Sequence, residues 1–184
     1  MRHCFIILAV CLTALSSCTG KMVYDHYEHT PIAGWDKVDE LTYNIPALKD
    51  SGRYATNLGL RINSAFPFQS LTLIVEQTVY PTSTENSKLK IQNESGHLNP
   101  FAKMPKAKRI VGKPQIYVDT INCTLFDTKG TVKGQGISYY QYHFRVSERD
   151  LHEGDSIHVT IRHDMKREIM PGISDVGISL VPAI

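Results

Sequence analysis

Cysteine, histidine, serine and the carboxylates are among the side chains of this 184-residue sequence that could act as nucleophiles, bases or metal ligands. His163 and Asp164 are adjacent, but one histidine and one aspartate form neither a catalytic triad nor a zinc site. Ser174 has Gly172 two residues before it and no glycine two residues after it, so it does not match a nucleophile elbow. Cys123 occupies an apolar position of an alternating stretch, where a cysteine behaves as a small buried hydrophobe. We therefore expect a non-enzymatic protein with no catalytic residue, no metal site and no cofactor.

Cys18 is the residue whose position indicates a covalent modification. Arg2 and an apolar run from residue 5 to 15 precede it, and this run is too short to remain as a membrane-spanning helix. The run ends in small residues, which predicts a removable signal peptide over residues 1–17. Leu15-Ser16-Ser17-Cys18 resembles the lipobox of bacterial lipoproteins, which implies cleavage before Cys18 and lipid attachment to its thiol. The alternative is an ordinary secretory signal that happens to contain this cysteine.

The composition of the remaining chain fits one domain. Cys4 and Cys11 leave with the signal, so Cys123 would be the one unmodified cysteine and no internal disulfide is expected. Basic and acidic residues nearly balance, and nothing in the overall charge favours nucleic acid as a partner. We expect a lipidated tether over residues 18–33 and a single domain over residues 34–184.

Period-two alternation of apolar and polar residues runs through most of that domain and indicates short strands. No window of helical period follows the signal, so we predict an antiparallel β-sandwich of seven to nine strands with a long basic loop insertion. The alternating stretches at 58–62 and 71–75 are interpreted as one hairpin-like unit. The side chains expected in the core are Leu60, Ile62, Leu73, Ile121, Leu125, Phe144, Val159 and Ile178.

The insertion covers residues 82–114 and contains seven basic residues against two acidic ones. A compact domain rarely contains so long an irregular loop unless the loop is functional or mobile. The functional interpretation is a contact with an anionic partner or a membrane surface. Its candidate residues are Lys103, Lys106, Lys108 and Arg109. The alternative is a solvated insertion without a partner.

Four groups of residues follow one another along the chain: 23–27 with 34–35; 54–63 with 66–71; 119–127 with Gly130, Gly134 and Gly136; and 163–166 with 170–177. Together they resemble the GldH family of lipoproteins, which is named for gliding motility in Bacteroidetes-type bacteria. The insertion is longer and more basic than the connection that this family usually has there.

The resemblance implies an accessory, non-catalytic envelope lipoprotein linked to gliding or to the associated secretion machinery. Its partners would be the membrane, through lipidated Cys18, and other envelope proteins, with no nucleic acid and no small-molecule substrate. Residues 19–23 lack the acidic cluster that resembles a surface-export signal in these bacteria, so we expect the periplasmic side of the outer membrane. The alternative function is a glycan-binding lipoprotein module that would use exposed rings such as Trp35, Tyr139 or Tyr142.

Overall fold

The computed structural model describes residues 22–84 and 109–183, and every regular element in these ranges is a strand. The strands are β1 (Tyr24–His29), β2 (Trp35–Asp36), β3 (Leu41–Ile45), β4 (Gly52–Asn63), β5 (Ser70–Tyr80), β6 (Thr82–Thr84), β7 (Arg109–Val111), β8 (Gln115–Thr124), β9 (Tyr139–Leu151), β10 (Ser156–His163), β11 (Ile169–Met170) and β12 (Ile173–Pro182). Within the described ranges, no helix is long and apolar enough to cross a membrane.

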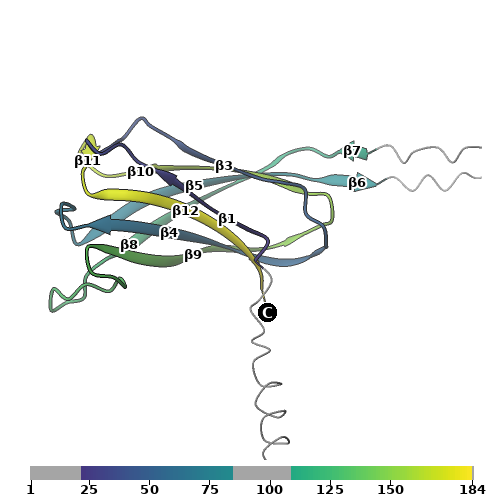
Figure 1. Cartoon of the computed structure of the whole chain (residues 1–184). Coiled ribbons are helices and arrows are strands. Elements are labelled where there is room, and N and C mark those ends of the chain that lie inside the picture. Colours follow the sequence, from purple (N-terminus) through teal and green to yellow (C-terminus); the bar gives the residue numbers. More distant parts are fainter. Residues whose placement is uncertain (1–21, 85–108, 184) are drawn as a thin grey trace, which may run out of the picture.

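Two four-stranded antiparallel sheets pack face to face (Figure 1). One sheet, called here the β4 sheet, has the strand order β1-β12-β4-β9. The other, the β5 sheet, has the order β3-β10-β5-β8. Two-stranded ribbons, β11-β2 and β6-β7, extend this body. The antiparallel β-sandwich predicted from the sequence is confirmed.

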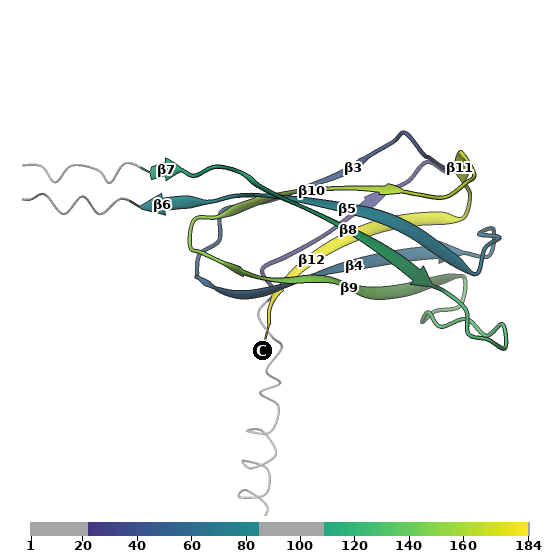
Figure 2. The same cartoon turned by 180° about the vertical axis from the view of Figure 1, so that it is seen from behind.

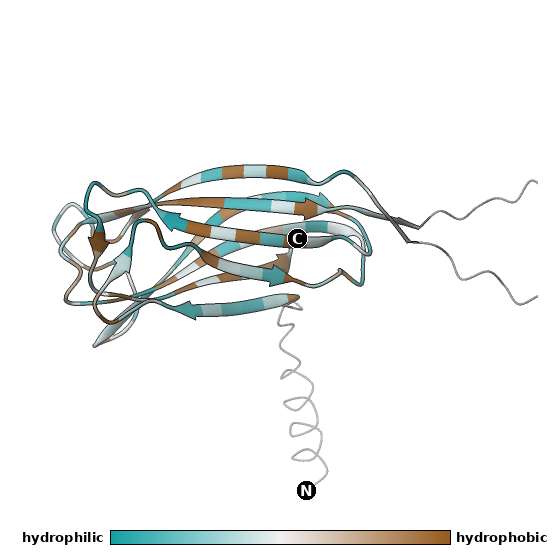
Figure 3. Cartoon of the chain, turned by 90° about the horizontal axis from the view of Figure 1, so that it is seen from above, coloured by the Kyte–Doolittle hydropathy of each residue, from teal (hydrophilic) through white to brown (hydrophobic). Residues whose placement is uncertain are grey.

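The core lies between the two sheets, and the alternation that predicted the strands is visible along them as alternating colour (Figure 3). Six of the eight predicted core residues are buried: Leu60, Ile62, Leu73, Leu125, Val159 and Ile178. Ile121 and Phe144 are only partly buried. They lie on β8 and β9, the edge strands of the two sheets, where fewer neighbours cover an inward side chain.

The prediction that the stretches at 58–62 and 71–75 form one hairpin-like unit is wrong. These stretches belong to β4 and β5, which lie in different sheets, and residues 64–69 carry the chain from one sheet to the other. Packed sheets are about 10 Å apart, a distance that six residues span easily. The side-chain period is the same whether two strands pair or face each other, so the pattern did not separate the two arrangements.

The sandwich also begins earlier in the chain than expected. β1 pairs with β12 along its whole length, from Tyr24 opposite Leu180 to His29 opposite Asp175. Residues 24–29 therefore belong to the β4 sheet and not to the tether. The stretch contains no aliphatic residue, which is why the sequence favoured a polar tether.

The insertion at residues 82–114 was expected to be an irregular loop, but it contains a short strand toward each end. β6 and β7 pair from Thr82 opposite Val111 to Thr84 opposite Arg109, and the Gly112 amide donates to the Pro81 carbonyl at 2.7 Å. This ribbon continues the pairing of β5 with β8 and extends beyond the sandwich (Figure 2). Residues 85–108 of the insertion lie outside the described ranges.

Candidate interaction face

A row of four residues crosses the outer face of the β4 sheet and has two glycines at its centre. Tyr27 of β1 is opposite Gly177 of β12, Gly177 is opposite Gly59 of β4, and Gly59 is opposite His143 of β9. A Cβ added to Gly59 would lie 2.6 Å from Cζ of Tyr27, and one added to Gly177 would lie 2.6 Å from its Cδ1. Real Cβ atoms do not come so close, so the tyrosine ring occupies the space that two side chains would need.

Arg61 covers the same ring from another side. The Cζ atom of its guanidinium lies 4.6 Å from the centroid of the Tyr27 ring, within the range of a cation–π contact. The Gln141 side-chain amide donates to the Tyr27 hydroxyl at 3.4 Å. The pKa of Tyr27 is raised above its ordinary value, and burial is the largest cause of this shift. The phenol therefore stays protonated and able to donate a hydrogen bond. Tyr27 is thus held between glycines and a guanidinium and offers no free ring face to a sugar.

Asp175 gives this face a nearly buried carboxylate, with a side chain that is only 6% exposed. Its Oδ1 faces Nδ1 of His29, and its Oδ2 lies 4.0 Å from Nη1 of Arg61. The Ser174 hydroxyl donates to Oδ2 at 2.7 Å. A carboxylate removed from water in this way is stabilised by opposite charges and hydrogen bonds around it. We call Tyr27, His29, Arg61, Gln141, His143 and Asp175 the Tyr27 cluster.

Four members of the Tyr27 cluster, Tyr27, Arg61, Gln141 and His143, line a hollow of about 440 Å³ on the outer face of the β4 sheet. In the described part of the chain, no group of three His, Cys, Asp or Glu side chains is placed to hold a metal ion. Cys123 is fully buried, and this burial raises its pKa to about 12, so the thiol is not a nucleophile at neutral pH.

The histidine that the sequence paired with Asp164 is a core residue. His163 is buried with its ring 5.4 Å from that of Trp35, edge to face, and its Nε2 lies 3.2 Å from the Trp35 carbonyl oxygen. Burial is the main cause that lowers the pKa of His163, which keeps the ring neutral. The indole of Trp35 donates to the Asp39 carbonyl at 3.0 Å. These contacts close one end of the sandwich.

The rings named for a glycan-binding module do not form a platform. Trp35 and Tyr142 are buried, and Tyr139 alone of the three is well exposed, at 54%. Part of the exposed apolar surface lies on the outer face of the β5 sheet. There Ile116 and Val118 of edge strand β8 are 63% and 60% exposed, two residues apart on one side of the strand. Exposed apolar side chains on a strand that lies at the sheet edge within the described ranges can contribute to a protein-binding surface.

The site residues predicted from the sequence are not brought together by the described structure. Cys18, Lys103, Lys106 and Lys108 lie outside the described residues, and Arg109 is the first residue of β7. The Tyr27 cluster was missed. Its signal is the pair of glycines that interrupt apolar alternation, in Leu58-Gly59-Leu60 and in Val176-Gly177-Ile178. A glycine inside a strand often marks a close approach by another group.

The family of the chain is shown by a match to a protein-family model. The family model described as GldH lipoprotein matches residues 22–98 and 106–180, which include both sheets of the sandwich. The chain belongs to the GldH lipoprotein family. The gliding motility lipoprotein GldH of Flavobacterium johnsoniae is 25% identical over 181 residues, covering 95% of this chain and 93% of the relative. The resemblance inferred from the sequence is confirmed, and the gap in the match, between residues 98 and 106, falls in the basic insertion.

One of the solved structures that the chain resembles is viral. A chain from the structure of infectious bursal disease virus, Gx strain, aligns at 10% identity with a TM-score of 0.17. The alignment covers 88% of this chain and 39% of the viral chain. A TM-score this low carries no argument about fold or function.

Proposed function

We propose that this GldH-family protein is a lipid-anchored, non-catalytic component of the cell envelope that acts in gliding motility or in the associated secretion apparatus. Family membership and the name of the Flavobacterium relative, a gliding motility lipoprotein, support this role. The anchor is Cys18, acylated after removal of residues 1–17. The proposed location is the periplasmic side of the outer membrane, where the sandwich would bind other envelope proteins.

One observation carries the non-catalytic, partner-binding part of the proposal. Three separate segments of family resemblance, 23–27, 54–63 and 170–177, become the neighbouring strands β1, β4 and β12. They place Tyr27, Arg61 and Asp175 on one outer face of the β4 sheet. Tyr27, Arg61, Gln141 and His143 line a hollow of about 440 Å³ on this face, and Arg61 and Gln141 hold the Tyr27 side chain there, so the cluster offers a partner a preformed polar surface.

The Tyr27 cluster would contribute to a protein interface through Arg61, Gln141 and His143. Arginine and tyrosine are over-represented among the residues that dominate binding energy at interfaces. Because Arg61 is already positioned by the Tyr27 ring and Asp175, little side-chain entropy remains to be lost when a partner binds.

Crosslinking and purification of the native lipoprotein test this function. Envelopes with wild-type protein should yield a defined set of crosslinked envelope proteins, and Arg61→Ala should deplete at least one of them. Arg162→Ala, on the outer face of the β5 sheet, is the matched control and should leave the set unchanged. The same Arg61→Ala strain should spread more slowly in a gliding assay. An unchanged set of partners and unchanged gliding would contradict the proposal.

We propose a second contact at the basic insertion. Positive charge is concentrated where the insertion enters β7: Lys103, Lys106 and Lys108 lie in the segment that connects β6 with β7, and Arg109 is the first residue of β7. This charge would attract an anionic partner or a membrane surface over roughly a Debye length, about 8–10 Å at physiological salt.

A further inference from the structure

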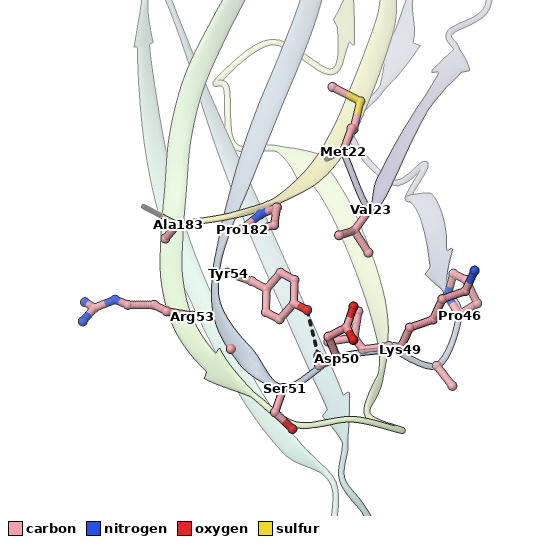
Figure 4. Close-up of a pocket in the computed structure, with 13 residues that line it drawn as sticks. Met22, Val23, Pro46, Lys49, Asp50, Ser51, Arg53, Tyr54, Pro182 and Ala183 are labelled. Atoms are coloured by element: carbon pink, nitrogen blue, oxygen red, sulfur yellow. Dashed lines mark hydrogen bonds between the residues drawn. The ribbon is translucent and has the colours of Figure 1, made fainter. Parts of the chain in front are cut away.

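A pocket of about 410 Å³ lies at the end of the sandwich where both ends of the described chain meet (Figure 4). Its walls are residues 22–23 and 182–183, together with the β3–β4 connection at 46–51 and the start of β4. The volume falls within the range of ligand pockets, about 300–1,000 Å³. No part of the Tyr27 cluster lines this pocket.

The walls of the pocket are held in place by backbone hydrogen bonds. The Val23 amide donates to the Leu180 carbonyl at 2.9 Å, and the Ala183 amide donates to the Arg53 carbonyl at 2.8 Å. The Tyr54 hydroxyl donates to the Asp50 carbonyl at 2.7 Å, which holds the ring against the connection. The pocket is therefore part of the folded sandwich and does not need a ligand to form.

Most of the side chains that line the pocket are apolar. Leu48 and Tyr54 are buried, while Met22 at 55% and Val23 remain exposed in spite of their large apolar side chains. Because Met22 and Val23 are adjacent in the chain and line one pocket with Leu48 and Tyr54, they add exposed apolar surface to it.

Charges flank this apolar surface. Lys49 and Arg53 are exposed and extend on opposite sides of the pocket (Figure 4). Asp50, between them in the chain, is also exposed and is the acidic residue of the lining. An apolar pocket flanked by two cations suits a molecule with an apolar tail and an anionic head.

The short stretch of chain between Cys18 and the pocket indicates which molecule of this kind is nearby. Three residues separate Cys18 from Met22, and four extended steps of the backbone span about 14 Å at most. With the Cys18 anchor that we propose above, the pocket lies within this distance of the membrane that holds the acyl chains. Membrane lipid is then the most concentrated apolar and anionic ligand near the pocket.

We propose that the pocket binds a phospholipid of the anchoring membrane. An acyl chain would lie against Met22, Val23, Leu48 and Tyr54, and Lys49 and Arg53 would bind the phosphate of an anionic headgroup. Binding at this second point would orient the sandwich on the membrane, because a tether alone leaves it free to rotate. This inference rests on the proposed lipid anchor.

The test uses the full lipidated protein in vesicles of phosphatidylethanolamine and phosphatidylglycerol that contain a phospholipid with a photoactivatable acyl chain. After illumination, mass spectrometry should locate crosslinks on Met22, Leu48 and Tyr54, and none in the turn at 127–130 at the opposite end of the sandwich. Ala47→Trp, at an exposed position of the lining, should lower these crosslinks on the order of tenfold by filling the pocket. Lys49→Gln with Arg53→Gln should lower them in anionic vesicles and not in neutral phosphatidylcholine vesicles. Lys129→Gln in the far turn is the matched charge control.

The outcomes separate the inference from the function on which it rests. Vesicle association with crosslinks spread evenly over the sandwich, or absent from the pocket, would overturn the lipid pocket and leave the Cys18 anchor intact. A pocket filled by the acyl chain of Cys18 itself would also exclude vesicle lipid and would overturn the inference. Failure of the mature protein to associate with vesicles at all would overturn the anchor and the pocket together.

Discussion

The Tyr27 side chain reaches across β12 and lies against Gly59 of β4, two strands away in the sheet. This contact ties β1, the first strand after the proposed anchor, to a central strand of the sandwich. β1 is an edge strand that pairs only with β12 among the described strands, so its side-chain contacts contribute much of what holds it. The contact is possible because Gly59 and Gly177 have no side chains that would meet the Tyr27 ring.

A double-mutant cycle tests this relationship. Gly59→Ala should lower the free energy of unfolding by about 1–3 kcal/mol, the usual cost of overpacking. In a Tyr27→Ala background the same change should cost much less, because the ring that the new methyl group would meet is gone. Urea unfolding of the four proteins measures both values. Equal costs in the two backgrounds would show that Gly59 is needed for another reason.

Truncation of the core should be severe in a chain whose single described cysteine is free. Leu60→Ala should cost about 2–5 kcal/mol, because this fully buried side chain would leave a cavity between the sheets. The exposed Ile116→Ala should stay within about 0.5 kcal/mol of wild type. Thermal unfolding compares the two variants, and a similar loss of stability in both would contradict the assignment of their faces.

Acidification should destabilise the domain through His163. Burial holds the pKa of His163 below its ordinary value of 6.5, so the folded state resists a proton that the unfolded chain accepts. The unfolded state thus binds more protons just below pH 6.5, and stability falls as the pH is lowered through that value. Urea midpoints at pH 8 and pH 5 should differ more for wild type than for His163→Gln. Equal differences would mean that His163 does not contribute to the pH dependence.

The pairing of Thr84 with Arg109 allows a direct test of the insertion. Replacing residues 85–108 with Asn-Gly would close the β6-β7 ribbon with a two-residue hairpin turn. The shortened protein should fold with an unchanged thermal midpoint, because both sheets lie outside the deleted segment. Loss of the folded state would instead make residues 85–108 part of the fold.

A separate variant tests whether the positive charge of the insertion contributes to binding. Changing Lys103, Lys106, Lys108 and Arg109 to Gln in the full-length protein should weaken binding to anionic vesicles or envelope partners at low salt. Wild-type binding should decline toward that of the variant as salt is raised, because salt screens exposed charges. Binding that is indifferent to both changes would leave the solvated-insertion interpretation.

The sequence predicted what a period of two can show, namely the strands, their inward faces and the antiparallel sandwich. It did not predict which strands pair. The stretches that begin near Leu58 and Leu73 show the same apolar–polar alternation whether their strands are neighbours in one sheet or face each other across the core. The Tyr27 cluster depended on that missing information. Residues 27, 59 and 177 become neighbours only through the order β1-β12-β4, and no local pattern encodes this order.

The intact mass of the protein extracted from membranes tests the lipid anchor most directly. A lipid anchor at Cys18 predicts a mature chain that begins at Cys18 and carries the added mass of its acyl groups. The Cys18→Ser variant should lack this mass and leave the membrane fraction. A wild-type chain of unmodified mass, or a Cys18→Ser variant that fractionates with membranes at the wild-type mass, would contradict the lipid anchor at Cys18.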